Sequence, residues 1–177
     1  MANFNVPSRK EVSANNQEIF DNLQKGLGMV PNLYAVMAHS ETALGNYLAF
    51  QNAKTSFSNK EKQAVNLVVS QVNECVYCQS AHTLLGTMNG LTEDQTIEIR
   101  KGNASFDDKL NSLVVLAKEI TAKKGFASSE TIDAFIKAGY NEGQVIELVF
   151  LVAEKTAMNY VQAITKVVND FPIAKSI

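Results

Sequence analysis

The lack of proline between Pro31 and Pro172 restricts the fold of this chain more than any other feature. Proline removes a backbone donor and breaks helix interiors, so its absence over so long a stretch permits long helices. Apolar residues in this stretch recur mostly at helical spacing, and few segments alternate in the way that strands do. The sequence therefore predicts an all-α fold, a bundle of about eight or nine helices.

Capping signals delimit the expected helices. The segments Ser58–Glu61 and Thr92–Gln95 have the form of capping boxes, which begin helices. Helices often end at a residue with left-handed backbone conformation, which glycine adopts easily. Four glycines follow helical runs in this way: Gly90, Gly102, Gly125 and Gly139. We expect helices at about 12–25, 32–39, 41–55, 59–71, 74–88, 93–101, 106–123, 129–138 and 142–168.

The last expected helix is apolar on nearly every side. From Val145 to Val152 only Glu147 is polar. A helix of this kind belongs in the centre of a core or in a subunit interface, and the pattern leaves both interpretations open. We favour a homo-oligomer, because nine helices in a chain of 177 residues make few layers that could hide such a helix.

Length and charge narrow the class of protein. The 177 residues contain no low-complexity tract and no linker, so a single domain over 1–177 is expected. The net charge of −2 argues against nucleic-acid binding, which needs a basic stripe. No run reaches the 18 or so apolar residues that span a membrane, and the first residues lack the apolar core of a signal peptide. We expect no membrane partner and a cytoplasmic location.

The chemistry of the chain is concentrated in the segment 73–82, NECVYCQSAH, which holds both cysteines, Cys75 and Cys78, and His82. At spacings of three and seven residues these side chains share one helix face. Asn73 is a candidate N-cap, which would place Cys75 in the first helical turn, where the helix dipole favours a thiolate. His82 follows Cys78 by one turn and could activate that thiol instead. The sequence does not choose between the two routes.

Two other interpretations of this segment remain open. Free cysteines are often small apolar core residues without a function. Alternatively, Cys75, Cys78 and His82 could bind zinc, with His39 as a fourth ligand. Zinc ligands usually come from two separated pairs, however, and His39 fits an exposed residue before Ser40. A redox dithiol is the favoured interpretation.

The residues around this segment resemble a known family. The stretch 57–91, with its C-x-x-C-x-x-x-H core, resembles the central motif of the alkylhydroperoxidase AhpD-like proteins of the carboxymuconolactone decarboxylase superfamily. The stretch 26–40, GLGMVPNLYAVMAHS, resembles the peroxidase-related branch of that superfamily. The stretch 139–150 and the later Asn159-Tyr160 pair are also similar to it, so the resemblance covers most of the chain.

The resemblance implies a helical fold assembled as a dimer, trimer or hexamer, and a dithiol that reduces hydroperoxides. One cysteine attacks the peroxide and becomes a sulfenic acid, the other condenses with it, and a partner dithiol protein reopens the disulfide. By analogy Cys78 attacks, Cys75 resolves, and His82 forms a proton relay with an upstream glutamate. No organic cofactor or metal is implied, because the thiols carry the electrons.

This sequence departs from the family pattern at the relay. The upstream acid is expected at position 63, which is Gln63, and an amide cannot take up a proton. Glu61 lies two residues away, on a different helical face, and Glu74 stands beside the thiols. Tyr77 lies between the cysteines. These four residues are the candidates for a relay with His82.

The predicted function is thiol-dependent reduction of hydroperoxides by an antioxidant peroxidase. Three alternatives stay open: a thiol-disulfide sensor or scaffold that does not turn over, a metal-binding module, and a lactone decarboxylase of the same superfamily. The substitution at Gln63 makes the sensor more credible, whereas the dithiol argues against the decarboxylase.

Overall fold

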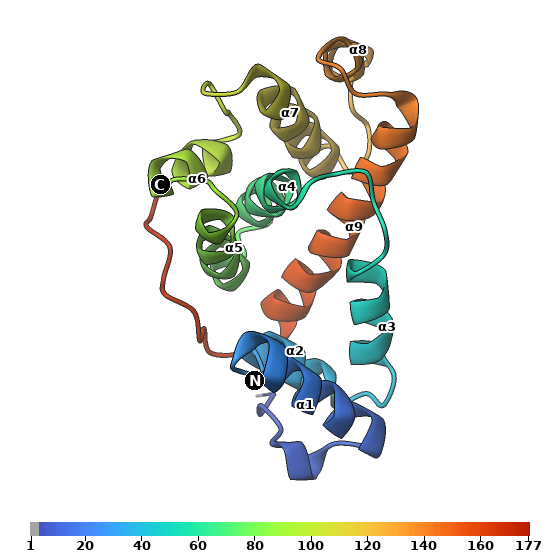
Figure 1. Ribbon diagram of the computed structural model, residues 1–177, viewed down its shortest axis with the longest axis vertical. Helices are drawn as coiled ribbons and strands as arrows, with labels where there is room; N and C mark the ends of the chain where they lie inside the picture. The colour runs from blue at the N-terminus through green and yellow to red at the C-terminus, as the bar shows by residue number, and fades with distance from the viewer. Residues whose placement is uncertain (1–3) are drawn as a thin grey trace. The chain divides into compact units, whose positions relative to one another are not determined.

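A computed structural model describes residues 4–177, and every regular element in this range is a helix (Figure 1). In chain order these elements are the 3₁₀ turn η1 (Arg9–Glu11) and the α-helices α1 (Ala14–Leu27), α2 (Asn32–Met37), α3 (Ala43–Gln51), α4 (Asn59–Val72), α5 (Val76–Met88), α6 (Glu93–Lys101), α7 (Asp108–Ala122), α8 (Ser129–Lys137) and α9 (Glu142–Thr165). The all-α prediction is confirmed, and each expected helix is present.

The largest difference in boundaries is at the end of α3, which stops at Gln51 rather than at the expected residue 55. The Asn52 side chain donates to the carbonyl of Leu48 over 2.8 Å and caps the helix there. Beyond the cap, the hydroxyl of Thr55 donates to Glu147 Oε2 over 2.8 Å. A contact 92 residues away in sequence thus holds the chain out of the helical path.

The predicted capping boxes are confirmed. At the start of α4, Ser58 N donates to Glu61 Oε2 over 2.8 Å, and Glu61 N donates to Ser58 Oγ over 3.3 Å. Thr92 and Gln95 make the same pair of contacts at the start of α6. Each box satisfies backbone donors that the helix itself leaves unpaired, a contribution of about 1 kcal/mol.

The described residues divide into two compact units. Unit 1 contains the described residues up to Lys54 together with Tyr160–Asp170, and unit 2 contains Thr55–Asn159 together with Phe171–Ile177. Helix α9 contributes residues to both units. The division into compact units does not test the expectation of a single domain over 1–177, which stays a prediction.

The core of unit 2 is built around α4, which contacts α5, α6 and α7 (Figure 1). Val65, Leu67, Val68 and Val69 on consecutive sides of α4 are fully buried, so this helix is apolar on more than one face. The core side chains of α7 and α9 that pack in the same cluster are Leu110, Leu113, Val114, Leu116, Ala117, Ile120, Leu148 and Val152. Each buried side chain of this size contributes about 1.5–3 kcal/mol.

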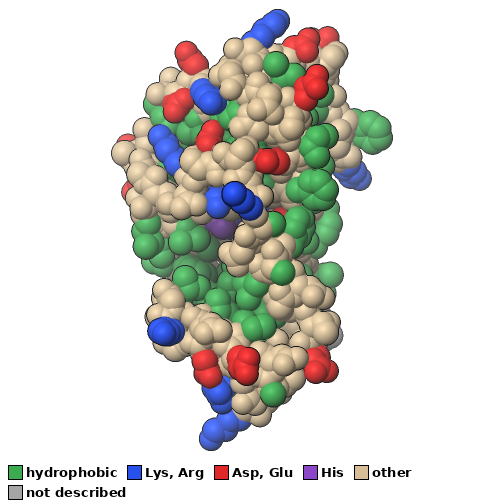
Figure 2. Space-filling view, turned by 45° about the vertical axis from the view of Figure 1, so that its right-hand side comes forward, with side chains coloured by type: hydrophobic (Ala, Val, Ile, Leu, Met, Phe, Trp, Pro, Cys, Tyr) green, Lys and Arg blue, Asp and Glu red, His purple; other side chains and the backbone are tan. Residues whose placement is uncertain are grey.

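Helix α9 is buried along one face only. Leu148 and Val152 lie in the core, whereas 59% of Ile146 and 44% of Val149 are exposed. On the face of the molecule drawn in Figure 2, hydrophobic side chains lie exposed among charged ones. A helix buried on all sides within the chain's own core is therefore the wrong interpretation of the apolar run, and a subunit interface stays a prediction.

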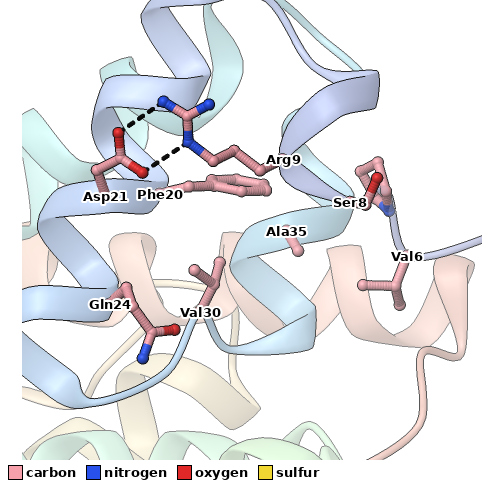
Figure 3. Close-up of a pocket in the computed structure, with 9 residues that line it drawn as sticks. Val6, Ser8, Arg9, Phe20, Asp21, Gln24, Val30 and Ala35 are labelled. Carbon is pink, nitrogen blue, oxygen red and sulfur yellow. Dashed lines mark hydrogen bonds and ion pairs between the residues drawn. The ribbon is translucent and has the colours of Figure 1, made fainter.

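Unit 1 has a small apolar core and contains a pocket. Phe20, Ala35 and Leu44 are buried in this core. The pocket has a volume of about 250 Å³, and its lining includes Phe20 and Ala35 (Figure 3). At its edge the Arg9 guanidinium donates to both carboxylate oxygens of Asp21, each over 2.7 Å. Each charged group is thus neutralised by the other.

Within residues 4–177, none of the helices combines the length and the apolar character that crossing a membrane requires.

Candidate functional site

A tight connection between α4 and α5 positions the two cysteines. Glu74 has a φ of 55°, a left-handed conformation that costs a non-glycine residue of order 1–2 kcal/mol. The backbone N–H of Cys75 then donates to the carbonyl of Ser70 over 2.9 Å. Only residues 73–75 separate the helices, so the chain reverses and α5 packs back against α4.

The N-cap of α5 is Cys75 and not Asn73, so the expected cap is wrong. Cys75 Sγ accepts from the backbone N–H of Cys78 over 3.2 Å. Asn73 instead ends α4, and its side chain donates to Asn159 Oδ1 over 2.9 Å. Cys75 caps the helix and Cys78 is its third residue, so both sulfurs lie at the positive end of the α5 dipole, which favours a thiolate at either position.

The sulfurs of Cys75 and Cys78 are joined in a disulfide. Both residues are buried, and their Cα atoms are 5.3 Å apart. The arrangement is that of a dithiol in its oxidised state, with two electrons removed from the pair.

His82 follows Cys78 by one turn of α5 and is 6% exposed. Its Nδ1 atom lies 2.8 Å from Oε1 of Gln63 on α4. An amide oxygen only accepts hydrogen bonds, so Nδ1 carries a proton in this contact. Burial, and to a smaller extent the positive charge of Lys155, holds the pKa of His82 well below its ordinary value of 6.5. The imidazole is therefore neutral near pH 7, and Nε2 is left as its basic atom.

Of the four relay candidates, Gln63 is the one whose side chain the structure brings to His82. Glu61 accepts from Ser58 in the capping box and from the Tyr140 hydroxyl over 2.6 Å. Burial raises the pKa of the Glu61 carboxyl, but the hydrogen bonds from Tyr140 and Ser58 outweigh burial and lower its pKa overall. Its carboxylate is thus engaged away from the relay.

The other two candidates differ in exposure. Glu74 is exposed to solvent, on the strained connection itself. Tyr77 is buried, and its ring meets that of Phe171 edge-on with centroids 5.5 Å apart. The ring between the two cysteines thus packs against the C-terminal segment of unit 2.

A buried ion pair, which the sequence patterns did not single out, lies on α9. Lys155 Nζ is 3.6 Å from Glu154 Oε1, and both side chains are 4% exposed. Burial lowers the pKa of Lys155, while the neighbouring Glu154 carboxylate works in the opposite direction. The available signal was a lysine on the apolar stripe of α9, between Val152 and Asn159 at helical spacing.

Asn159 connects the ion-pair helix to the cysteine turn. Its Nδ2 donates to Ser70 Oγ over 3.3 Å, and its Oδ1 accepts from Asn73. The Ser70 carbonyl in turn accepts from the backbone of Cys75 and from Gln79 Nε2, the latter over 3.3 Å. These contacts tie α9, the end of α4 and the start of α5 together.

Asn66 leaves a buried acceptor open on the same side of α4. It lies three residues after Gln63 and four before Ser70, so the three side chains share a helix face. Asn66 is 6% exposed, and its Oδ1 accepts no hydrogen bond among the described residues. A buried amide oxygen without a donor costs about 1–3 kcal/mol, a cost that a hydrogen bond from a water molecule would remove.

Arg100 holds the start of α5 from the other side. This buried guanidinium donates to Gln71 Oε1 over 2.9 Å and to Gln79 Oε1 over 3.0 Å. It also donates to the backbone carbonyl of Lys175 over 2.6 Å. The residue directly after Cys78 is therefore fixed by α4, α6 and the C-terminal segment together.

The residues considered for a metal site do not form a recognisable ligand cluster in the part of the chain that the structure describes. No group of three or more His, Cys, Asp or Glu side chains is placed to hold an ion there. His39 is exposed, and its Nε2 lies 2.9 Å from the backbone carbonyl oxygen of Asn5.

Comparison with known proteins finds one matching family model and several solved structures with the same fold. Residues 37–119 match the model of the carboxymuconolactone decarboxylase family. No curated protein matches the sequence. A peroxidase-related protein from Ralstonia eutropha JMP134, described as an alkylhydroperoxidase AhpD core, superposes with a TM-score of 0.86 at 14% identity, covering 94% of this chain and 91% of that chain.

Two further solved structures share the fold. An uncharacterised peroxidase-related protein from Silicibacter sp. TM1040 has a TM-score of 0.83 and 19% identity, over 96% of this chain and 91% of that chain. The debrominase Bmp8, solved with 2,3,4-tribromopyrrole, has a TM-score of 0.80 and 15% identity, over 96% of this chain and 92% of that chain. The predicted AhpD-like fold is confirmed, and proteins that share it carry different activities in their names.

Proposed function

Since residues 37–119 belong to the carboxymuconolactone decarboxylase family and the chain has the AhpD-like fold, we propose that it reduces hydroperoxides with the Cys75–Cys78 pair. The observation that carries the proposal is the disulfide at the start of α5 with a buried, neutral imidazole one turn further along. The relatives named as peroxidase-related proteins support the reaction class.

The reaction begins with the reduced pair. The Cys78 thiolate attacks the terminal oxygen of a hydroperoxide, the O–O bond breaks, and the alcohol leaves with one added proton. Cys78 is now a sulfenic acid. The Cys75 thiolate attacks that sulfur and displaces hydroxide, which takes up a proton and leaves as water. The product is the disulfide, and a dithiol reductant returns two electrons by thiol-disulfide exchange.

His82 moves the protons in this scheme. With Nδ1–H donated to Gln63, Nε2 is the atom free to accept the proton of the Cys78 thiol and to pass it to the leaving alcohol. Gln63 fixes the imidazole tautomer but takes no proton itself, so turnover depends on His82 alone.

The test is to mix the reduced protein with cumene hydroperoxide and to count free thiols with time. Both thiols are lost within one chain, without an intermolecular crosslink. A Cys75→Ser variant stops at the sulfenic acid, which dimedone traps on residue 78, whereas a Cys78→Ser variant does not react. Thiols that survive for hours in the unmodified protein would overturn the proposal.

A sensor that reacts once is the second candidate, and Gln63 is the observation that favours it. Gln63 supplies no base to His82, so the cysteine pair would be oxidised once by a peroxide without rapid turnover. Supplying dithiothreitol in excess separates the two functions: a peroxidase consumes many equivalents of hydroperoxide, and a sensor consumes about one per chain.

We further propose that the physiological reductant is a dithiol protein and that the chain works as a homo-oligomer. The disulfide must be reopened by thiol exchange, which calls for a dithiol donor. That the donor is a protein is what the resemblance to the AhpD-like proteins implies. The exposed apolar side of α9 is the candidate contact between copies.

A further inference from the structure

We propose that the exposed apolar side of α9 packs against the same side of α9 in a second copy of the chain, with the two helices antiparallel. The inference rests on the homo-oligomer named in the proposed function and adds an orientation and a register to it. It is drawn from the residues of α9 (Glu142–Thr165) alone and does not depend on the peroxide chemistry.

The outward side of α9 lacks charged residues over most of its length. Between positions 148 and 165 the charged residues are Glu154 and Lys155, and both side chains are 4% exposed. The exposed residues in this stretch are all valine, phenylalanine, alanine, tyrosine or isoleucine. The centre of a protein interface is depleted of charge in the same way, whereas a helix side that faces water is usually charged or polar. Covering this side would remove apolar surface from water without burying a charge.

The exposed apolar residues recur at the spacing of a helix-pairing seam. Successive members are four, three, four, three and four residues apart, which is the period of two helices packed along one another. They lie on one continuous helix (Figure 1) and span about 27 Å of it. We call these residues the α9 seam: Ile146, Phe150, Ala153, Ala157, Tyr160 and Ile164.

The order of side chains in the α9 seam is nearly the same in both directions. Ile146 and Ile164 lie nine residues on either side of position 155. The aromatic residues at 150 and 160 lie five residues from it, and the alanines at 153 and 157 lie two. Two antiparallel copies related by a two-fold axis at position 155 therefore place isoleucine on isoleucine, aromatic ring on aromatic ring and alanine on alanine. A two-fold contact requires this self-complementarity and a different partner does not, so the pattern favours a second copy.

The sizes of the side chains fit two helices that cross at the two-fold axis. Helices paired through such a seam cross at about 20°, so their axes are closest at one point and diverge on both sides of it. Ala153 and Ala157 flank that point and permit a close approach. Phe150 and Tyr160, each 58% exposed, fill the wider space on either side and can pair ring to ring. The antiparallel orientation also brings the helix dipoles into a favourable alignment.

The test is crosslinking between single-cysteine positions in the full-length chain. Ala153→Cys and Ala157→Cys are co-expressed with tags of different size, and the purified mixture is oxidised with copper phenanthroline. The native cysteines are joined to each other in the oxidised protein, so the introduced thiol is the free one. About half of randomly paired dimers contain one copy of each variant, and we expect these to crosslink because position 153 then faces position 157 within disulfide reach.

Each variant expressed alone is expected to crosslink poorly. In the antiparallel arrangement two copies of the same introduced cysteine are offset by four residues, about 6 Å along the axis. Crosslinked bands that are strong in each variant alone and weak in the mixed dimer indicate parallel helices and overturn the inference. Ala134→Cys, which changes an exposed alanine of α8, is the control for collisional crosslinking.

Light scattering on the unmodified protein separates this inference from the homo-oligomer itself. An oligomer in which the mixed dimer crosslinks no more than the Ala134→Cys control overturns the α9 contact and leaves the homo-oligomer in place. A monomeric mass overturns both. Hydroperoxide turnover is measured separately and bears on the cysteine chemistry alone.

Discussion

Gln63 Oε1 lies 2.8 Å from His82 Nδ1, so a neutral amide occupies the place where the AhpD-like pattern expects a carboxylate. Gln63 still forms the hydrogen bond to the imidazole that a relay would need, but its amide cannot act as a base. The imidazole is oriented but is not made more basic, because an amide oxygen does not stabilise an imidazolium as a carboxylate does.

Replacing Gln63 with Glu is therefore expected to accelerate peroxide reduction. A carboxylate at this position raises the pKa of His82 and adds general-base help, which contributes 10²-fold or more where it operates. Stopped-flow measurement of disulfide formation checks the rate. Gln63→Leu, which removes the hydrogen bond and adds no charge, is the control. Equal rates in Gln63→Glu and Gln63→Leu would show that the position takes no part in the relay.

Stability is expected to fall as the pH drops below the ordinary His82 pKa of 6.5. The folded-state pKa of His82 is depressed, so below pH 6.5 the unfolded chain binds a proton that the folded chain does not. The free energy of unfolding then decreases by about 1.4 kcal/mol per pH unit until the folded pKa is reached. Urea denaturation at pH 7.5, 6.5 and 5.5 measures this slope. His82→Leu should flatten it, and a variant that keeps the full slope would assign it to another group.

Arg100→Met is expected to destabilise the chain by about 2–4 kcal/mol, because it leaves the buried amide oxygen of Gln79, the half-buried one of Gln71 and one backbone carbonyl without their donor. Thermal unfolding followed by circular dichroism gives the change in melting temperature. Arg9→Met is the matched control, since Arg9 bonds Asp21 at the surface and its removal should leave the melting temperature nearly unchanged. Similar losses in both variants would contradict the assigned role of Arg100.

An acidic substitution on the exposed face of α9 is expected to dissociate an oligomer. Ile146→Glu places a charge in the proposed contact between copies, and light scattering reports the mass in solution. Leu27→Glu changes an apolar residue of similar exposure, 55% against 59%, outside α9. A mass that falls in both variants, or in neither, would remove the case for this interface.

Local signals were sufficient for most helix boundaries. Ser58 and Thr92 form hydrogen bonds with residues three positions later in the chain. Such a cap depends on a few neighbouring residues, so a short stretch of sequence is enough to predict it. Cys75 as a cap was missed because the amide of Asn73, the better capping residue by type, is taken by Asn159, 86 residues later. The C-terminal end of α3 was overextended for the same kind of reason, a contact with Glu147.

The chemistry of the candidate site was only partly visible in the sequence. The spacing of Cys75, Cys78 and His82 within one short helix is a local pattern, and so it was recognised. The sequence gives little indication that Lys155 is buried, because burial of a lysine depends on which helices cover it. The partner of His82 was identified by position in a family pattern, and the hydrogen bond of Gln63 needed coordinates.

Cys75 caps α5 with its sulfur, and the strength of that sulfur as a hydrogen-bond acceptor changes when the disulfide is opened. A thiolate is a stronger acceptor for the Cys78 amide than a disulfide sulfur is. Gaining two electrons therefore tightens the opening turn of the helix, and losing them lets it fray. Deuterium uptake at the Cys78 amide would then be slower in the reduced protein than in the oxidised protein. The backbone at the start of α5 would thus report the oxidation state of the cysteine pair.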